Sequence, residues 1–182
     1  MTDHSPPAII VTTDRLVLRE MREDDTDELL CIFSDPEAMK YFNVVFDRPR
    51  MLKWVRDNLE HQKQHGFSLW TVVLRETGEV IGDCGLETDT IEGVFTVGLG
   101  FDFQRKHWNQ GYATEAARAA LAHAFGHYRF EKISAWINPE NKASQRVAEK
   151  IGMTVAKTVD RGGKTYLLYS IRKDKSSQTV QT

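Results

Sequence analysis

The sequence contains few cysteines and lacks any long apolar run. Cys31 and Cys84 are the only two cysteines among 182 residues, too few for the disulfide framework that stabilises small secreted domains. We therefore expect two reduced thiols in the apolar core of a cytoplasmic protein. No window approaches the ~20 apolar residues of a membrane span, so we expect no membrane association. The opening residues MTDHSPPAII carry no basic flank followed by an apolar stretch, and we expect no signal peptide.

An excess of positive charge is also missing. The chain has 24 Lys and Arg against 26 Asp and Glu, for a formal net charge of -2, which argues against nucleic acid as a partner. With 41% hydrophobic residues, a chain of this length can bury roughly 70% of its unfolded surface in one core. We predict an N-terminal extension over 1–11, one domain over 12–173 and a polar C-terminal tail over 174–182.

Hydrophobic periodicity predicts a mixed α/β domain. Apolar residues alternate with period two in the predicted strands and recur with helical spacing in the predicted helices. In the helix expected over 35–42, Asp35 is the cap and Pro36 the first residue. Asn141 is the expected cap of another helix, which Gly152 closes. The predicted strands are 15–21, 67–75, 80–87, 94–103, 131–137 and a final hairpin within 153–173, and further helices are expected after the acidic residues 23–27, over 49–64 and over 112–126.

A polar junction between a strand and an alanine-rich helix is the clearest candidate for a binding site. It lies in the stretch FDFQRKHWNQGYATEAARAALAHAF, residues 101–125. A helix N-terminus has free N–H groups and about +0.5 of an elementary charge, which favours phosphate binding without a lysine. Gly111 allows close approach of an anion to the backbone. An ordinary strand-to-helix turn is the alternative, and the junction contains neither GxGxxG nor a nucleoside-triphosphate loop.

This junction is one of several segments that follow one another in a recognisable order. They are TDRLVLREM with DDTDELLCIFSDPEAMKYF, then GEVIGDCGLE, then HWNQGYATEAARAALAHAF, and finally INPENKASQRVAEKIGM. Together they resemble the GNAT superfamily of acyl-coenzyme A-dependent N-acyltransferases, in particular its RimJ/RimL-like branch, over roughly residues 12–171. The resemblance implies a single-domain GNAT fold: a mixed, mostly antiparallel sheet of about seven strands with a splayed strand pair, flanked by four or so helices. It also implies acetyl-coenzyme A as co-substrate.

The resemblance further implies where coenzyme A binds. The strand that includes Leu99, Gly100, Phe101 and Phe103 would bulge and splay from 131–137, and the pantetheine arm would pass through the gap. Two glycines, Gly98 and Gly100, independently suggest a bulge or a close approach in that strand. Asn141 would hydrogen-bond the pantetheine arm, and Ser144 would lie near the thioester sulfur. The pyrophosphate would be held by backbone amides of Trp108, Asn109, Gln110, Gly111, Tyr112, Ala113 and Thr114.

The chemistry of amide formation calls for a base, an N–H group for the oxyanion and a proton for the thiolate. Relatives often have Glu where this chain has Gly98, so the base cannot be transferred by resemblance. Asp102 and Glu87 remain as candidates, each equally well explained as a solvated surface carboxylate. A backbone amide within 99–101 is the expected oxyanion donor. Ser144 is either the acid for the thiolate or an ordinary first-turn residue.

The acceptor follows less directly from the sequence. Deprotonating a lysine amine at pH 7 costs about 4.6 kcal/mol, against about 1 kcal/mol for an α-amine. Without an obvious buried base, an α-amine of a protein or peptide N-terminus is the expected acceptor. A small amine such as an aminoglycoside, polyamine or amino acid is the alternative, as is a catalytically silent acyl-coenzyme A sensor. We expect a monomer or homodimer without metal, since the pairs His61/His65 and His123/His127 lack the glutamate of HExxH.

Overall fold

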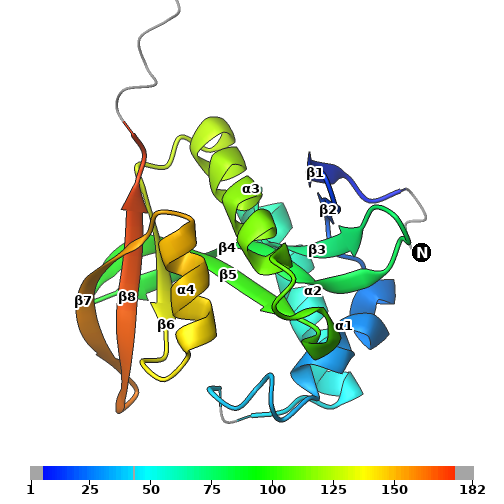
Figure 1. The fold of residues 1–182 in the computed structure, drawn as a ribbon, viewed down its shortest axis with the longest axis horizontal. Helices are drawn as coiled ribbons and strands as arrows, with labels where there is room; N and C mark the ends of the chain where they lie inside the picture. The colour runs from blue at the N-terminus through cyan, green and yellow to red at the C-terminus, as the bar shows by residue number, and fades with distance from the viewer. Residues whose placement is uncertain (1–5, 43, 175–182) are drawn as a thin grey trace, which may run out of the picture.

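Eight strands form a single sheet that runs through the whole domain (Figure 1). The computed structural model describes residues 6–42 and 44–174. The strand order is β1-β2-β3-β4-β5-β6-β8-β7, and every neighbouring pair is antiparallel except the parallel pair β5 and β6. The strands are β1 Ile9–Thr12, β2 Leu16–Arg19, β3 Leu69–Leu74, β4 Val80–Ile91, β5 Val94–Phe103, β6 Lys132–Ile137, β7 Thr154–Arg161 and β8 Lys164–Arg172.

The first strand was not expected. Strand β1 pairs antiparallel with β2, although it lies largely within the segment 1–11 that we assigned to an extension. It raises the strand number from about seven to eight and moves the start of the sheet to Ile9. Its four residues, IIVT, do not alternate between apolar and polar and so lack the period-two pattern of a half-buried strand.

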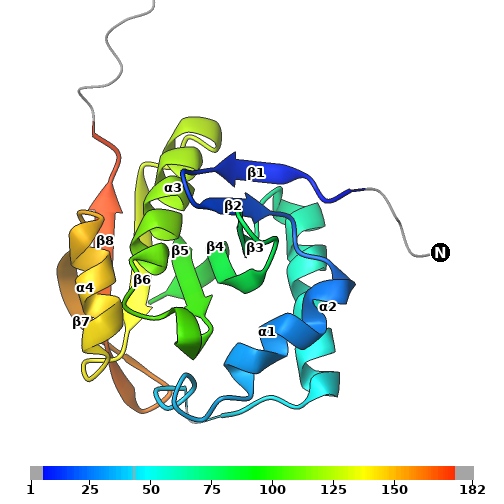
Figure 2. The same ribbon diagram turned by 45° about the vertical axis from the view of Figure 1, so that its right-hand side comes forward.

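Four α-helices cover the two faces of the sheet: α1 Thr26–Phe33, α2 Arg48–His65, α3 Tyr112–His127 and α4 Lys142–Lys150. Helices α3 and α4 lie in front of the sheet in Figure 1, whereas α1 and α2 lie on its other side, as the turned view in Figure 2 also shows. Leu86 and Leu99 pack with alanines of α3 in the larger core cluster. On the opposite face, Leu69 packs with Leu29 and Met51 from α1 and α2.

The short helix predicted over 35–42 is wrong. This segment forms consecutive turns instead, although the Asp35 side chain does accept a hydrogen bond from the Glu37 backbone N–H, as expected of a helix cap. The backbone N–H of Met39 then bonds to the Asp35 carbonyl, and that of Phe42 to the Met39 carbonyl. Met39 is buried between α1 and α2, so the turns are anchored without a continuous helix.

The two thiols have different surroundings. Cys84 is buried in β4, as predicted, but Cys31 is exposed on α1, which corrects its assignment to the core. Its neighbours Leu29, Ile32 and Phe33 occupy the buried face of the helix. Among the described residues, no helix is long and apolar enough to cross a membrane.

Candidate active site

Strands β5 and β6 part immediately after a single paired position. Gly98 of β5 is opposite Ser134 of β6, and this is the only pair joining the two strands. Strand β6 instead pairs along its whole length with β8, which draws it away from β5. The splay that the resemblance implied is therefore present, and it leaves residues 99–103 without a β6 partner.

The bulge expected in β5 is not found. The register with β4 is continuous from the pair Ile91↔Val94 to the pair Gly82↔Phe103. The glycines instead make room for side chains of neighbouring strands. A Cβ atom on Gly100 would lie 3.0 Å from Cδ2 of Leu69, and one on Gly98 would lie 3.3 Å from Cγ of Glu87. The close approach predicted from these glycines thus comes from within the protein.

The junction between β5 and α3 is tightly folded. A short 3-10 helix, Arg105–His107, follows the strand, and the Trp108 indole N–H donates a 2.7 Å hydrogen bond to the Phe103 carbonyl. Asn109 and Gly111 both adopt left-handed conformations, with φ of 59° and 84°. These two reversals turn the chain so that α3 begins at Tyr112 with Gly111 as its N-cap.

The N-terminus of α3 has no side-chain cap. No backbone hydrogen bond in the described structure uses the N–H groups of residues 109–114, and a helix cannot satisfy its first N–H groups internally. Arg15 stands behind this row: its Nη1 donates to the Gln110 carbonyl over 3.0 Å, and its guanidinium lies 4.4 Å from the centroid of the Tyr112 ring. Consecutive free amides beside a guanidinium suit a diphosphate.

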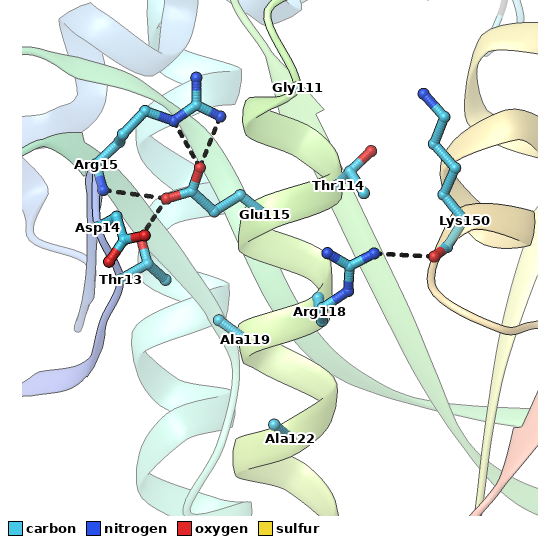
Figure 3. Close-up of a pocket in the computed structure, with 10 residues that line it drawn as sticks. All are labelled: Thr13, Asp14, Arg15, Gly111, Thr114, Glu115, Arg118, Ala119, Ala122 and Lys150. Carbon is cyan, nitrogen blue, oxygen red and sulfur yellow. Dashed lines mark hydrogen bonds and ion pairs between the residues drawn. The ribbon is translucent and has the colours of Figure 1, made fainter.

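A groove of about 550 Å³ continues from this junction along the outer side of α3 (Figure 3). Arg118 of α3 donates a 3.0 Å hydrogen bond to the backbone carbonyl of Lys150 at the end of α4, and Figure 3 shows both side chains in the space between the two helices. These cations make the groove suitable for a further phosphate group. Its lining residues are Thr13, Asp14, Arg15, Gly111, Thr114, Glu115, Arg118, Ala119, Ala122 and Lys150.

Helix α4 begins with the predicted cap. The Oδ1 atom of Asn141 accepts a hydrogen bond from the Ser144 backbone N–H over 3.1 Å, so the Nδ2 group of Asn141 is the part left to bind a ligand. Ser144 is in the first turn, and its side chain is partly exposed. The Tyr41 hydroxyl donates to the Glu140 carbonyl over 3.2 Å. The segment after α1 therefore reaches the loop between β6 and α4, on the side where β5 and β6 part.

Acidic side chains project from β4 and β5 on the face opposite α3. Glu87 is opposite Gly98, and Asp83 is opposite Asp102. Directly opposite residues of a ladder share one face, and residues at i and i+4 of a strand also share it. Asp83, Glu87 and Asp102 are therefore on one side of the sheet, next to the separation of β5 and β6.

Burial and mutual repulsion perturb these carboxyl groups. Asp83 is fully buried and neither of its carboxylate oxygens has a hydrogen-bond partner; burial, then the charges of Asp102 and Glu87, raise its pKa well above the ordinary value. Burial, then the charge of Glu87, raises the pKa of Asp102 to about 6. The Glu87 side chain is exposed, yet desolvation by the protein around it, then the charge of Asp89, raises its pKa too.

Asp83 is a candidate that the sequence analysis missed. Its position was available as a signal, because it stands four residues before Glu87 in a strand predicted to pair with its neighbour. What the sequence did not supply was the register, which places Asp83 against Asp102. Ser134 was missed for the same reason: its hydroxyl is buried and unpartnered, and it is opposite Gly98.

The paired histidines make contacts within the fold. His61 is partly buried, and its two ring nitrogens lie 2.7 Å from the Phe67 carbonyl and 3.0 Å from the Thr88 hydroxyl, which links α2 to β4. The rings of His123 and His127 stack at 5.0 Å. Within residues 6–42 and 44–174, no cluster of three or more potential metal ligands occurs.

The chain belongs to the GNAT family of acetyltransferases. The family described as "Acetyltransferase (GNAT) domain" matches residues 15–154, and the splayed strands and uncapped α3 described above are consistent with binding of an acyl-coenzyme A co-substrate. The protein is accordingly an acyltransferase enzyme. It is 41% identical over 160 residues to an uncharacterised protein, YkkB, of Bacillus subtilis (strain 168), covering 87% of this chain and 93% of that protein.

Two further comparisons support the family. An uncharacterised N-acetyltransferase, p20, of Bacillus licheniformis is 32% identical over 145 residues, which is 76% of this chain and 79% of that protein. The crystal structure of a GNAT acetyltransferase from Bacillus anthracis superimposes with a TM-score of 0.76 at 28% identity, covering 89% of this chain and 97% of that chain.

More distant structures share the fold alone. One is the ribosomal L7/L12 alpha-N-protein acetyltransferase RimL, with a TM-score of 0.76 at 16% identity, covering 92% of this chain and 95% of that chain. Another is the aminoglycoside acetyltransferase AAC(6')-Ib, with a TM-score of 0.71 at 17% identity, covering 87% and 95%. The fold therefore does not distinguish a protein acceptor from a small-molecule acceptor.

Proposed function

We propose that this enzyme transfers an acetyl group from acetyl-coenzyme A to the α-amine of a protein or peptide N-terminus, as expected of a RimJ/RimL-like protein. The proposal depends mainly on one observation. A carboxyl group without a basic partner, Glu87, stands beside Gly98 at the position where β5 and β6 part, which is where a thioester and an amine would meet.

The coenzyme is assigned to the opposite side of the sheet from Glu87. The free amides of residues 109–114 bind the diphosphate, and the groove cations Arg118 and Lys150 bind the remaining phosphate. The pantetheine arm passes between β5 and β6, where alternate residues of 99–103 direct backbone groups toward the missing strand partner. The Nδ2 group of Asn141 hydrogen-bonds the arm, because Oδ1 is already used by the helix cap.

Glu87 is the preferred base because of its relation to Gly98. Cα atoms of the two residues are paired across β4 and β5, and Oε1 of Glu87 would lie 3.6 Å from a Cβ atom on Gly98. A carboxylate from the neighbouring strand thus occupies the space that a glutamate at position 98 would use. Asp102, four residues after Gly98 on β5, is the alternative base.

The raised pKa values of these carboxyl groups change the argument about the acceptor, but the expected acceptor is still an α-amine. The sequence analysis assumed no obvious buried base, whereas the preferred base Glu87 has a raised pKa and the alternative base Asp102 has a pKa of about 6. Proton transfer to such a group is uphill by roughly 2 pKa units from an α-ammonium and roughly 4 from a lysine ammonium, or about 2.5 against about 6 kcal/mol. An α-amine is still the easier acceptor.

Two other groups complete the chemistry. When bound, the acetyl thioester supplies an electrophilic carbonyl and a thiolate leaving group. Backbone N–H groups within 99–101 stabilise negative charge on the carbonyl oxygen, which is the role that preorganised amides serve best. The hydroxyl of Ser144, in the first turn of α4, donates a hydrogen bond to the departing sulfur. Glu87 receives the proton that the attacking amine releases.

Two measurements test the proposal in sequence. Calorimetry with coenzyme A and acetyl-coenzyme A should show binding, and absence of binding by the folded protein would refute the co-substrate assignment. Thiol release should then be measured with N-terminal peptides, Nα-blocked lysine peptides, polyamines and aminoglycosides as acceptors. The free N-terminal peptides should react fastest, whereas faster reaction of the blocked lysine peptides or the aminoglycosides would exclude the α-amine assignment.

A further inference from the structure

Many carboxylates on this protein have a basic partner. Among the described residues, salt bridges join Glu23 to Arg56, Asp25 to Arg19, Asp27 to Arg48, Asp35 to Arg105, Glu79 to Lys106, Asp89 to Arg161, Glu92 to Lys157 and Glu115 to Arg15. In contrast, within the described residues no salt bridge or side-chain hydrogen bond involves Asp83, Glu87 or Asp102. We call these three residues the acidic strip.

The acidic strip is unfavourable for the protein alone. Asp83 is 0% exposed and both of its carboxylate oxygens are unsatisfied. The hydroxyl of Ser134, 1% exposed, is likewise unsatisfied and is in the row that joins Glu87, Gly98 and Ser134 across three strands. Buried polar groups of native proteins nearly always have partners, so these unpaired groups, beside the carboxyl groups of Asp102 and Glu87, favour a ligand that brings both hydrogen-bond donors and positive charge.

A single ammonium group cannot contact the whole acidic strip. Asp83 and Glu87 are four residues apart on β4, which corresponds to about 13 Å along a strand. The Glu87 end is beside Gly98, where the reacting amine is placed under the proposed function. The Asp83 end is beside Asp102, which is partly exposed and therefore accessible to a ligand, with Asp83 behind it.

We propose that Asp102, supported by Asp83, binds a second positive charge on the acceptor while Glu87 accepts the proton of the reacting amine. The inference rests on the proposed function and narrows its substrate class to amines with an additional cationic group. In an N-terminal peptide, that group would be a lysine or arginine side chain within about the first four residues, given about 3.3 Å per residue of extended chain. A diamine offers the same chemistry from a small molecule.

Matched acceptors isolate the second charge. One pair consists of short N-terminal peptides with arginine or its neutral isostere citrulline at the third position; the other consists of 1,4-diaminobutane and 4-amino-1-butanol. We expect kcat/KM for the charged member of at least one pair to exceed that of the neutral member by about tenfold or more, the usual value of a hydrogen-bonded charge. The pair that shows the preference identifies its source.

Substitutions then locate the subsite. In Asp83→Asn and Asp102→Asn, the ratio of charged to neutral acceptor should fall toward 1, whatever happens to the rate with the neutral acceptor. Glu87→Gln should lower both rates together and keep the ratio. Glu92→Gln, at the tip of the β4–β5 hairpin and paired with Lys157, is the control that should change neither. Thermal unfolding of each variant shows that its fold is retained.

Two outcomes would overturn the inference while leaving the proposed function intact. One is equal kcat/KM within both acceptor pairs in the natural protein. The other is a preference that survives both Asp83→Asn and Asp102→Asn in folded protein. Failure of every amine to release thiol would instead refute the proposed function itself, so the two failures are distinguishable.

Discussion

Glu87 and Gly98 occupy facing positions on β4 and β5, and a Cβ atom on Gly98 would lie 3.3 Å from Cγ of Glu87. The absence of a side chain at position 98 is therefore what admits the Glu87 carboxyl group to the place where β5 and β6 part. The position of the proposed base therefore depends on residues of both strands.

The first prediction concerns this relation. Glu87→Gln should lower kcat/KM by about 100-fold or more, the range found for removal of a general base. The acid limb of the pH–rate profile should also be lost, because a carboxyl group with a raised pKa no longer titrates. Steady-state thiol release from pH 5 to 9 provides the measurement, with Glu92→Gln as the control.

Exchange of the two residues provides a stronger test. Glu87→Gly should be as impaired as Glu87→Gln, whereas the double variant Glu87→Gly with Gly98→Glu should recover about tenfold or more of the lost rate, since it returns a carboxylate to the same space from the other strand. If Glu87→Gln retains full activity while Asp102→Asn loses it, Asp102 is the base instead.

A second prediction concerns the groove beside α3. Lys150→Met keeps the apolar stem of the side chain and removes its charge, so it should weaken coenzyme A binding by about threefold to tenfold, or about 1 kcal/mol. Affinity for dephospho-coenzyme A, which lacks the 3'-phosphate, should hardly change. Calorimetry with the two ligands makes this comparison, and equal weakening of both would remove Lys150 from the phosphate site.

A third prediction concerns the turn into α3. Gly111 has a φ of 84°, a conformation that costs an L-residue about 1–2 kcal/mol. Gly111→Ala should therefore destabilise the protein by about 1 kcal/mol and also weaken coenzyme A binding. The control is Gly126→Ala in the same helix, where an added Cβ would meet nothing within 4 Å, and it should stabilise by up to about 1 kcal/mol. Chemical denaturation measures both changes.

A fourth prediction follows from the raised pKa of Asp102, about 6. An acid whose folded-state pKa is raised favours folding when protonated, so this contribution is complete below its unfolded pKa near 3.9 and is lost as pH rises through about 6. Asp102→Asn should thus be more stable than the natural protein at pH 7.5, by up to about 3 kcal/mol. The difference should shrink toward zero near pH 4.

Urea denaturation at the two pH values checks this sign. A variant equally or less stable than the natural protein at pH 7.5 would show that the Asp102 carboxylate does not bear the cost of burial and repulsion that we assign to it. The effect is a trade of stability for function, which is common among residues of binding and catalytic sites.

Sequence periodicity predicted most of the fold. Strand β5 was predicted to run from Val94 to Phe103 and does so, because its apolar residues and turn-forming flanks are local features. The N-cap at Asn141 was confirmed by its hydrogen bond to Ser144. The helix over 35–42 was wrong: the bond from Glu37 to the Asp35 cap forms, but the chain continues as turns around the buried Met39, a tertiary contact that local spacing does not show. Strand β1 was missed because its residues IIVT do not alternate between apolar and polar.

The candidate site divides in the same way. The uncapped start of α3 and its glycine are encoded in consecutive residues, so the junction that we propose to bind phosphate was predictable from the chain. The partners of Glu87 and Asp102 were not, because they depend on the register between β4 and β5, which is set by the two-residue turn between Ile91 and Val94 and was not assigned from the sequence.

The sequence alone determined the mixed α/β class, the junction at residues 109–114 and the resemblance that proved to be family membership, since each is encoded in local spacing or local composition. Only the tertiary structure decided that β6 leaves β5 after Gly98, that Glu87 fills the space above this glycine, and that Asp83 stands unpaired behind Asp102. Those relations join strands across the sheet, and the energy that fixes them comes from packing of the whole domain rather than from any one segment.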